Sequence, residues 1–275
     1  MMATGVTIAL TRYAESDELL TRSLSAAVRQ TGVKGEILLV EQRVDAPFDR
    51  NLIAKGNIPL RVIADACGSL SAARNIALKE ARYDHILYLD ADALPQPDWA
   101  QKMSNALEQE GVAIVGGRIL PGWEHSPPFF TRANVVLDQY SMLDLGQKDG
   151  PATKVVGASF GVDRSKVPSH IRFDPELGRR EGRLFGGEES AFFAEVRAAR
   201  LRARYVGTTY VTHLVAHERL RLRWILERMF YAGYGRSSQG GAPAPSQRLN
   251  IVDWVVAPIM LPPYVAGWLW SKLSR

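Results

Sequence analysis

The segment from His85 to Asp92 constrains the fold of this chain more than any other. Its apolar run Ile86–Leu89 includes a tyrosine and is typical of a buried strand in a parallel sheet. Two carboxylates, Asp90 and Asp92, follow one residue apart. Ligands of open α/β sheets bind beyond the carboxyl ends of strands, and neighbouring carboxylates repel unless a cation or a hydroxyl-rich ligand separates them. The segment therefore favours a site for a hard divalent ion carrying a diphosphate. An Asp-X-Asp alone is also found as a cap or in a solvated loop.

The rest of the chain alternates between strand and helix patterns. The predicted strands are Val6–Leu10, Glu36–Glu41, Leu60–Ala64, Val112–Val115, Lys154–Val162, Ala203–Tyr205 and Thr208–Val211. The predicted helices are Ser16–Gln30, Ala72–Ala81, Asp98–Glu110, Ala191–Arg200 and Leu220–Tyr231. Between Pro121 and Pro151 the pattern weakens. This alternation predicts a doubly wound, mostly parallel α/β sheet with helices on both faces.

Composition narrows the class of protein. A chain of 275 residues with 46% hydrophobic residues can bury one sizeable core. The single cysteine, Cys67, excludes an internal disulfide and fits a reducing compartment. The run Val6–Leu10 follows the first methionine without a signal-type segment, so we expect the chain to start in the cytoplasm.

The net charge of +5 is unevenly distributed. Arg172–Arg183 contains four arginines and Arg200–Arg236 contains eight more. Such clusters suit phosphates, anionic lipid headgroups or nucleic acid. The chain has no helix-turn-helix, zinc-finger or RNA-binding signature, so we expect no nucleic-acid partner.

Taken in order, the motifs resemble those of a family 2 glycosyltransferase. They are Thr11-Arg12-Tyr13-Ala14-Glu15, Glu41 at a strand end, Ala73-Arg74-Asn75, Asp90-Ala91-Asp92, Gly186-Gly187-Glu188-Glu189 and His213. The resemblance covers roughly residues 6–236 and implies the GT-A fold, a Rossmann-like α/β architecture. It also implies inverting transfer of a sugar from a nucleotide-diphospho-sugar, with a UDP-sugar favoured, and Mg²⁺ or Mn²⁺ as cofactor.

The resemblance assigns the loop Thr11–Glu15 to the nucleoside. Thr11 and Tyr13 would bind there, with the tyrosine against the base. Ala14 replaces the asparagine that is usual in the family. The alternative is a loop that leads into a helix and carries a packing tyrosine.

Two further residues are implied donor contacts. Glu41 lies where the family places an acid at the edge of the base; a solvated acid at a strand end is the alternative. Arg74 lies at a helix start, where a guanidinium can form paired hydrogen bonds to phosphate or to the base beside a favourable helix dipole. Its alternative is a surface arginine.

The resemblance gives the Asp-X-Asp segment its role at the metal. Asp90 would lie near the ribose, Ala91 beside the donor, and Asp92 on the divalent ion. His213 would complete the metal site. His217, four residues later, is the competing histidine, but the Val-X-His spacing favours His213.

Glu188 and Glu189 are the candidate catalytic residues. In the family, the second acid of the pair removes the proton from the acceptor hydroxyl and the first binds the acceptor. Acids in the first turn of a helix also stabilise the helix dipole without any chemistry. That reading does not explain the paired glycines, Gly186-Gly187, which allow a ligand to approach the backbone closely.

The C-terminal run Ile251–Trp270 has the length of a membrane span, ~20 residues. It contains Asp253, and Pro258, Pro262 and Pro263 are expected to break a helix. Its tryptophans and tyrosine suit the headgroup level. We therefore expect a membrane-seated or re-entrant tail. A true span and packing on the protein's own surface are the alternatives.

These patterns predict a domain plan. Residues 1–218 would form the GT-A domain, 219–236 a basic amphipathic helix, 237–250 a linker, and 251–275 a membrane-proximal extension. The acceptor would be a carbohydrate or lipid-linked glycan in polysaccharide or glycolipid synthesis. The enzyme would be peripheral to the anionic cytoplasmic face of the inner or plasma membrane. A nucleotidyltransferase of similar fold and a non-catalytic nucleotide-sugar-binding scaffold are the alternatives.

Overall fold

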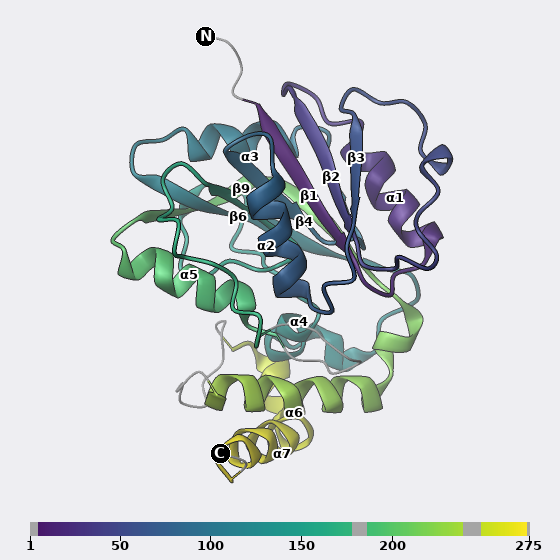
Figure 1. Cartoon of the computed structure of the whole chain (residues 1–275). Coiled ribbons are helices and arrows are strands. Elements are labelled where there is room, and N and C mark those ends of the chain that lie inside the picture. The colour runs from purple at the N-terminus through teal and green to yellow at the C-terminus, as the bar shows by residue number, and fades with distance from the viewer. Residues whose placement is uncertain (1–4, 178–185, 239–248, 274–275) are drawn as a thin grey trace.

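The computed structural model describes residues 5–177, 186–238 and 249–273. Its strands are β1 (Val6–Arg12), β2 (Gly35–Glu41), β3 (Leu60–Ala64), β4 (His85–Leu89), β5 (Ala93–Pro95), β6 (Val112–Trp123), β7 (Gly150–Pro151), β8 (Ser159–Asp163) and β9 (Arg202–Val215). They form one mixed sheet in the order β3-β2-β1-β4-β8-β6-β9-β5, with β7 beside β9 (Figure 1). The first four strands are parallel, as predicted, and β8 runs antiparallel between β4 and β6.

Helices cover both faces of the sheet. They include α1 (Asp17–Ala27), α2 (Leu70–Glu80), α3 (Trp99–Leu107) and α5 (Glu188–Ala198). Side chains alternate along a strand, so Ile8 packs with α1 and α3 on one face, while Ala9 packs with α2 and α5 on the other. Both faces of the central strands are therefore buried, which explains their nearly continuous apolar sequence.

Several predicted boundaries are wrong. β6 extends far beyond Val115, and the two short strands predicted near Tyr205 and Thr208 are one strand, β9. The two long strands pair in parallel along most of their length, with shifts in register. This pairing overrides the breaks that Gly116-Gly117 and Gly207 suggest. β8 starts at Ser159 rather than Lys154, and α5 starts at Glu188 rather than Ala191.

The segment between Pro121 and Pro151 has some regular structure. It holds the end of β6, the 3₁₀ turn η2 (Phe129–Arg132), α4 (Asn134–Gln139) and β7. Two further 3₁₀ turns are η1 (Arg50–Leu52) and η3 (His217–Leu220). Of the arginine-rich segment Arg172–Arg183, residues 178–183 lie outside the described residues, as does most of the predicted linker 237–250.

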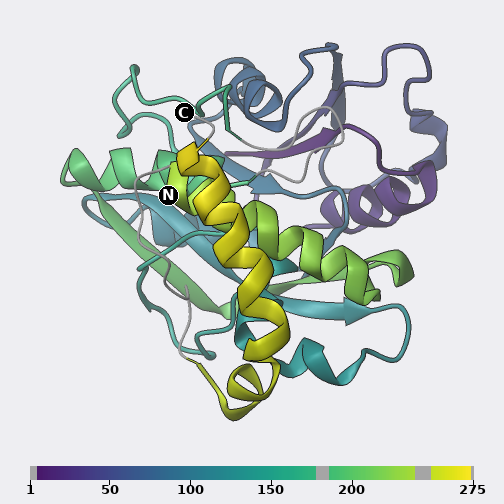
Figure 2. The ribbon, with the colours of Figure 1, turned by 90° about the horizontal axis from the view of Figure 1, so that it is seen from below.

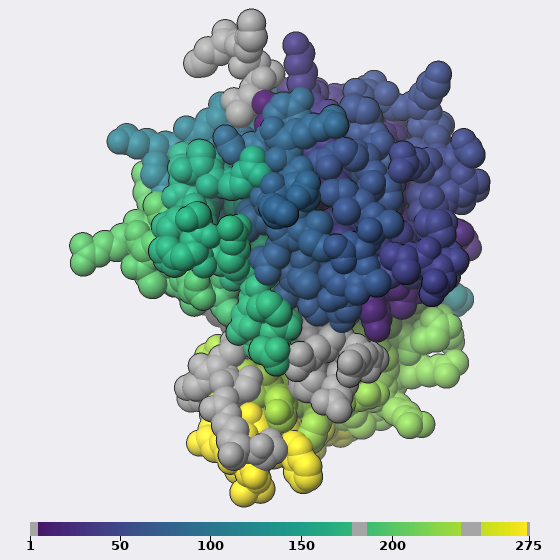
Figure 3. All heavy atoms as spheres, in the orientation of Figure 1, coloured from purple at the N-terminus to yellow at the C-terminus, as the bar shows by residue number. Residues whose placement is uncertain are grey.

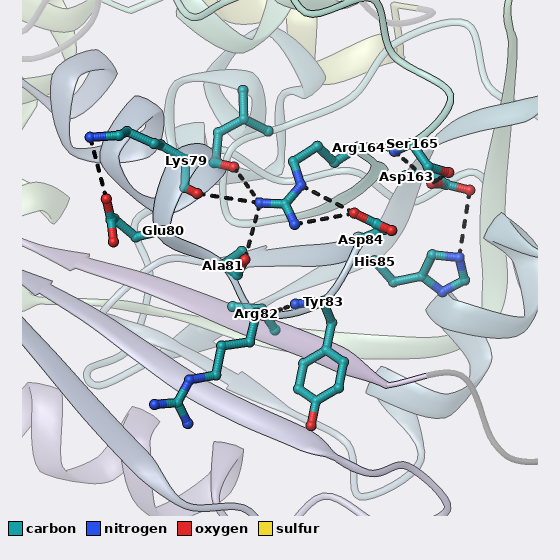
Figure 4. Close-up of polar contacts among 12 residues, drawn as sticks. Lys79, Glu80, Ala81, Arg82, Tyr83, Asp84, His85, Asp163, Arg164 and Ser165 are labelled. Atoms are coloured by element: carbon teal, nitrogen blue, oxygen red, sulfur yellow. Dashed lines mark hydrogen bonds and ion pairs between the residues drawn. The ribbon is translucent and has the colours of Figure 1, made fainter.

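Arg164, just after β8, closes the C-terminal end of α2 (Figure 4). Its guanidinium donates to the carbonyl oxygens of Leu78, Lys79 and Ala81 at 3.0–3.4 Å and to the Asp84 carboxylate at 3.1–3.2 Å. The last carbonyls of a helix have no partner within the helix. One side chain thus satisfies several of them and joins α2 to β8 and to the loop before β4.

We expect Arg164→Ala to lower the free energy of unfolding by about 1–3 kcal/mol, because charge-assisted hydrogen bonds to these carbonyls are lost. Urea denaturation of the full chain measures this. Lys79→Ala is the matched control, since that side chain lies at the same helix end but is 81% exposed. Equal effects of the two substitutions would show that the contacts of Arg164 add nothing.

The C-terminal part is a pair of crossing helices, α6 (Leu222–Ser238) and α7 (Ile251–Leu273). In Figure 2, seen from below, α7 lies nearest the viewer and crosses α6. The space-filling view shows the pair as a layer beneath the rest of the molecule (Figure 3). The two helices cross so closely that a Cβ at Gly233 would collide with the Tyr264 carbonyl, and one at Gly267 with the Phe230 carbonyl.

The expected break at the prolines is wrong, because α7 continues through Pro258, Pro262 and Pro263. A proline costs a helix one hydrogen bond and a steric clash with the preceding turn. Pro258 and Pro262 lie on the exposed side of α7, so their rings do not interrupt the contact with α6. The packing of the opposite side therefore offsets their cost.

A helix on a water-exposed surface usually buries its apolar side chains and exposes its polar ones. In α7 this distribution is largely reversed. The inner side buries Asp253, Gly267 and Ser271 along with Val256 and Met260. The outer side is a stripe of exposed apolar residues: Ile251, Trp254, Val255, Pro258, Ile259, Pro262, Ala266, Leu269, Trp270 and Leu273. We call this stripe the outer face of α7. Among the described residues, α7 alone has the length and apolar composition to cross a membrane.

Asp253 is the acidic residue in this apolar run, and its hydrogen bonds explain why it is there. Its buried carboxylate accepts hydrogen bonds from the backbone N–H of Val135, at the start of α4, and of Asn250. The Asn250 side chain also donates to the Arg132 carbonyl. The first turn of α7 and the residue before it are thus tied to α4 and η2.

Candidate active site

A cavity of about 910 Å³ lies at the carboxyl ends of β1 and β4 and extends to α6 and α7. It brings together most of the residues predicted from the sequence. Those that line it are Thr11, Tyr13, Arg74, Asp90, Ala91, Asp92, Glu188, Glu189 and His213. Tyr13 is 43% exposed, so its ring is accessible to a ligand.

β5 and β9 place Asp92 beside His213. The two strands pair antiparallel with Ala93 opposite His213, and the Leu214 N–H donates to the Asp92 carbonyl at 2.8 Å. The Asp92 carboxylate lies 2.9 Å from His213 Nε2. Burial disfavours a charged imidazole, but the Asp92 carboxylate outweighs it and raises the pKa of His213 above its usual value.

Asp90, Asp92 and His213 fit a divalent metal ion. Each offers a ligand atom, and these atoms lie within 4.8 Å of one another. His213 Nδ1 lies 2.8 Å from the Tyr140 carbonyl oxygen, so it acts as the donor and leaves Nε2 as the ligand nitrogen on the side of Asp92. The two carboxylates suit Mn²⁺ or Mg²⁺, and the imidazole favours Mn²⁺, a transition metal, over Mg²⁺. His217 instead packs its ring against His125, with 4.6 Å between ring centroids.

Arg74 connects Asp90, one of the possible metal ligands, to Glu188 of the acidic pair. Its buried guanidinium donates to Glu188 at 2.7 Å and to Asp90 at 3.3 Å. The rings of Phe160 and Phe173 lie 5.3 and 5.9 Å from it. Arg74 is thus not the surface arginine that was the alternative. Its predicted contact with the donor stays a prediction, and the structure shows a bridge between α2, β4 and α5.

Glu188 and Glu189 differ in environment although they are adjacent. Gly187, with a φ of 100°, starts α5 in a left-handed conformation that favours glycine. Both line the cavity, but Glu188 is buried and bonded to Arg74, whereas Glu189 is half-buried. Burial and then the charge of Glu188 raise the pKa of Glu189 to about 8. A carboxylate with a pKa near neutrality can accept a proton efficiently.

Glu41 does not line the cavity. It is fully buried, accepts a hydrogen bond from Arg12 at 2.9 Å, and accepts others from the backbone N–H groups of Arg43 and Phe48. Arg12 also pairs with Asp17. The solvated acid that was the alternative is therefore wrong. The predicted contact with the base stays a prediction, and the observed role is to hold the loop after β1 against β2.

The site also contains residues that the sequence did not single out. Arg219, in η3, donates to Asp92 at 3.1 Å. Lys154 pairs with Asp138 at 2.9 Å. Arg228 and Arg236 of α6 line the far part of the cavity. The cluster of arginines in residues 200–236 was a signal for the three arginines, whereas no pattern in the sequence indicated Lys154 or Asp138.

Comparisons with known proteins place this chain in a family. The family profile named Glycosyl transferase family 2 matches residues 7–167. The "Pre-mycofactocin glycosyltransferase" of Mycobacterium tuberculosis is 27% identical over 164 residues, which are 59% of this chain and 33% of that protein. The "Glucosyl-dolichyl phosphate glucuronosyltransferase" of Haloferax volcanii is 22% identical over 235 residues, 84% of this chain and 74% of that protein. The chain thus spans about a third of the first relative and about three quarters of the second.

A solved structure shows the same fold. The crystal structure of GalNAc-T7 with UDP, GalNAc and Mn²⁺ matches with a TM-score of 0.57 and 16% identity, over 87% of this chain and 51% of that one. The likeness confirms the predicted GT-A architecture. The family profile covers more than half of the chain, and this protein therefore belongs to glycosyl transferase family 2, a family of sugar-transferring enzymes.

Proposed function

We propose that this enzyme transfers a sugar from a nucleotide-diphospho-sugar to an acceptor hydroxyl with inversion at the anomeric carbon. The proposal rests on one observation, which is that a single cavity holds both a cluster of possible metal ligands and a candidate base. The cluster is Asp90, Asp92 and His213, and the base is Glu189. Direct displacement is favoured when a base for the acceptor and a cation for the leaving group lie on opposite sides of the reacting carbon.

Asp92 and His213 would hold the divalent ion, with Asp90 beside them. When bound, the ion supplies Lewis-acid stabilisation of the charge on the departing diphosphate. Arg219 lies against Asp92 and adds positive charge at the same place. Tyr13 and Thr11 border the cavity at the end of β1, where the nucleoside would lie.

Glu189 would take the proton from the acceptor hydroxyl. As it does so, the acceptor oxygen forms a bond to the anomeric carbon, and the bond from that carbon to the diphosphate oxygen breaks. The electron pair of that bond leaves on the diphosphate. Glu188, held by Arg74, would position the acceptor alongside.

The donor is testable by thermal shift. A panel of nucleoside diphosphates with and without Mn²⁺ identifies the base, because a ligand that binds the native state raises its melting temperature. We expect UDP with Mn²⁺ to give the largest shift; GalNAc-T7, which shares the fold, was crystallised with UDP and Mn²⁺. A panel in which no nucleotide stabilises the protein in the presence of metal would contradict the proposal.

The enzyme would act at an anionic cytoplasmic membrane surface, on a carbohydrate or lipid-linked acceptor for a polysaccharide or glycolipid. Support comes from the outer face of α7, which is apolar although it faces away from the protein. Tryptophans such as Trp254 and Trp270 on that face suit the headgroup region. Asp253 ties the start of α7 to α4, which favours a helix lying in the interface over one that crosses the bilayer.

We expect a triple variant of the outer face, Ile259→Ser, Leu269→Ser and Trp270→Ser, to weaken binding to phosphatidylglycerol vesicles by ~10-fold or more. Each side chain contributes apolar burial worth up to ~1.5–3 kcal/mol when it is fully covered. Co-sedimentation with vesicles measures the change, and the melting temperature should stay the same because the three side chains are 48–60% exposed.

The matched control replaces exposed apolar residues elsewhere. Val44→Ser, Leu52→Ser and Leu145→Ser change side chains that are 45–50% exposed on other elements. This control should pellet with vesicles like the unchanged protein. If both triple variants pelleted equally well, α7 would not be the membrane-binding element.

A further inference from the structure

The backbone turns sharply at the end of α4, which lies between the sheet and α6 (Figure 1). Tyr140 is the residue that caps α4, and Ser141 follows with a φ of 59°. Among the described residues, only Ser141 and Arg200 combine a side chain with a positive φ. Residues other than glycine adopt this conformation where neighbouring contacts hold them there, often at functional sites. Ser141 also lines the cavity, which places this disfavoured turn at the candidate active site.

Two backbone hydrogen bonds form the turn. The N–H groups of Ser141 and Met142 donate to carbonyls within α4 at 3.1 and 3.2 Å. This is the Schellman arrangement, in which a left-handed residue lets the chain fold back over the last turn of a helix. These two bonds do not use the Tyr140 carbonyl, which instead accepts a hydrogen bond from His213 Nδ1 at 2.8 Å.

The side chain of Tyr140 is held on several sides. Its buried ring stacks on Trp224 of α6, with 5.3 Å between centroids, and meets Trp123 of β6 edge to face at 5.6 Å. Its hydroxyl donates to the Arg219 carbonyl at 2.9 Å. Beyond the turn, the Leu143 backbone pairs with β6 through hydrogen bonds of 2.7 and 3.2 Å. The position of the Tyr140 carbonyl is therefore fixed by the fold.

This carbonyl determines what His213 can offer to a ligand. A neutral imidazole has one N–H and one lone pair, and a carbonyl oxygen can only accept a hydrogen bond. The Tyr140 carbonyl therefore keeps the N–H at Nδ1 and the lone pair at Nε2, which lies 2.9 Å from Asp92. A metal ligand needs that lone pair, and the hydrogen bond at the other nitrogen orients the ring.

We propose that Tyr140 is a positioning residue for the metal site and that the left-handed turn at Ser141 aims its carbonyl at His213. The turn fixes both the tautomer and the orientation of the imidazole. In this role neither Tyr140 nor Ser141 bonds to the ion itself. The inference rests on the proposed function, because it concerns the ion that would bind the donor diphosphate.

Substitutions of Ser141 test this role because they change the backbone of the turn and leave the metal ligands intact. Ser141→Val is expected to weaken Mn²⁺ binding by ~10-fold or more, the usual cost of losing an outer-shell partner of a metal ligand. A β-branched residue strongly disfavours a positive φ, so valine rotates the peptide group that contains the Tyr140 carbonyl. Isothermal titration calorimetry of Mn²⁺ into the full chain with UDP present measures the affinity.

Ser141→Asn and Ser141→Gly are the matched controls at the same position. Asparagine adds bulk to the cavity wall as valine does, but asparagine and glycine both tolerate a φ of 59°. Both variants should bind Mn²⁺ like the unchanged protein. If Ser141→Asn weakened Mn²⁺ binding as much as Ser141→Val, the bulk of the side chain would be the cause and the inference would fail.

Arg200→Val is the control for a general loss of stability. Arg200 has the same φ of 59° just after α5, is exposed, and does not line the cavity. Both valine variants should lower the melting temperature, because both force a side chain out of a tolerated backbone shape. Only Ser141→Val should lower the Mn²⁺ affinity, and equal Mn²⁺ affinities of the two would overturn the inference.

NMR of the unchanged protein labelled with ¹⁵N-histidine is a second measurement, which does not depend on the folding of Ser141→Val. Mg²⁺ replaces Mn²⁺ here, because Mn²⁺ is paramagnetic and broadens the signals. With UDP and Mg²⁺ we expect the ring proton of His213 on Nδ1, with its signals assigned by their loss in His213→Ala. A proton on Nε2 would overturn the inference.

The unchanged protein separates this inference from the proposed function. If Mn²⁺ gave no gain in its UDP affinity, the proposed function would fail and this inference with it. If Mn²⁺ raised UDP affinity in the unchanged protein and equally in a folded Ser141→Val, only the role of the turn would fail.

Discussion

Glu189→Gln is expected to lower turnover by ~10²–10⁴-fold, the usual contribution of a general base. Glutamine keeps the size and hydrogen bonding of the side chain but cannot accept the acceptor proton. Donor affinity should be nearly unchanged, because Glu189 lies on α5 rather than among Asp90, Asp92 and His213. Steady-state turnover and UDP affinity, measured on the same protein, test both halves of the expectation.

The pH profile gives a second test of the same role. The pKa of Glu189 is raised to about 8, so the carboxylate is mostly protonated at neutral pH and becomes an available base as the pH rises through that value. We therefore expect kcat/KM, which reports the free enzyme, to rise with pH and level off above about 8. The residual activity of Glu189→Gln should lack this rise.

Glu188→Gln is the matched control, since it makes the same change one residue earlier. It removes the negative charge that faces Arg74, and it should mainly weaken use of the acceptor. An inactive Glu188→Gln beside an active Glu189→Gln would mean that the two roles are exchanged. If both variants stayed active, the base would be another residue.

Asp92→Asn is expected to abolish the gain in nucleotide affinity that Mn²⁺ provides. Loss of an outer-shell partner of a metal ligand already costs ~10–100-fold in metal affinity, and Asp92 would be a direct ligand. The substitution also removes the charge that faces His213 and Arg219. UDP titrations with and without Mn²⁺ measure the effect, and circular dichroism checks that the fold is kept.

Two histidines provide the comparison for this result. His213→Ala should behave like Asp92→Asn, because His213 is the histidine that lies beside the two aspartates. His217→Ala should keep Mn²⁺-dependent UDP binding, since its ring packs against His125 instead. Unchanged Mn²⁺-dependent affinity in both Asp92→Asn and His213→Ala would place the metal elsewhere.

The parallel half of the sheet and the Asp-X-Asp edge were predictable because their signals are local. A buried strand such as Ile86–Leu89 shows its apolar run directly, and β3 was predicted with its observed ends. The carboxylates Asp90 and Asp92 follow their strand in sequence, so strand position alone indicated where they lie. Family resemblance then added His213, which β5 and β9 do bring to Asp92.

The remainder depends on contacts between distant segments. Arg74 and Glu188 are 114 residues apart, and no local pattern indicates that a guanidinium at a helix start binds that carboxylate. The length of β9 follows from its pairing with β6 rather than from its own residues. Likewise, α7 remains helical through its prolines because its other side packs on α6.

The close packing of α6 on α7 at Gly233 and at Gly267 makes the two helices one rigid unit. Each glycine lies against a backbone carbonyl of the other helix, so neither helix can slide or rotate without moving its partner. If α7 lies in the membrane interface, as proposed above, a change in its tilt would also move α6, which carries Arg228 and Arg236 in the cavity wall.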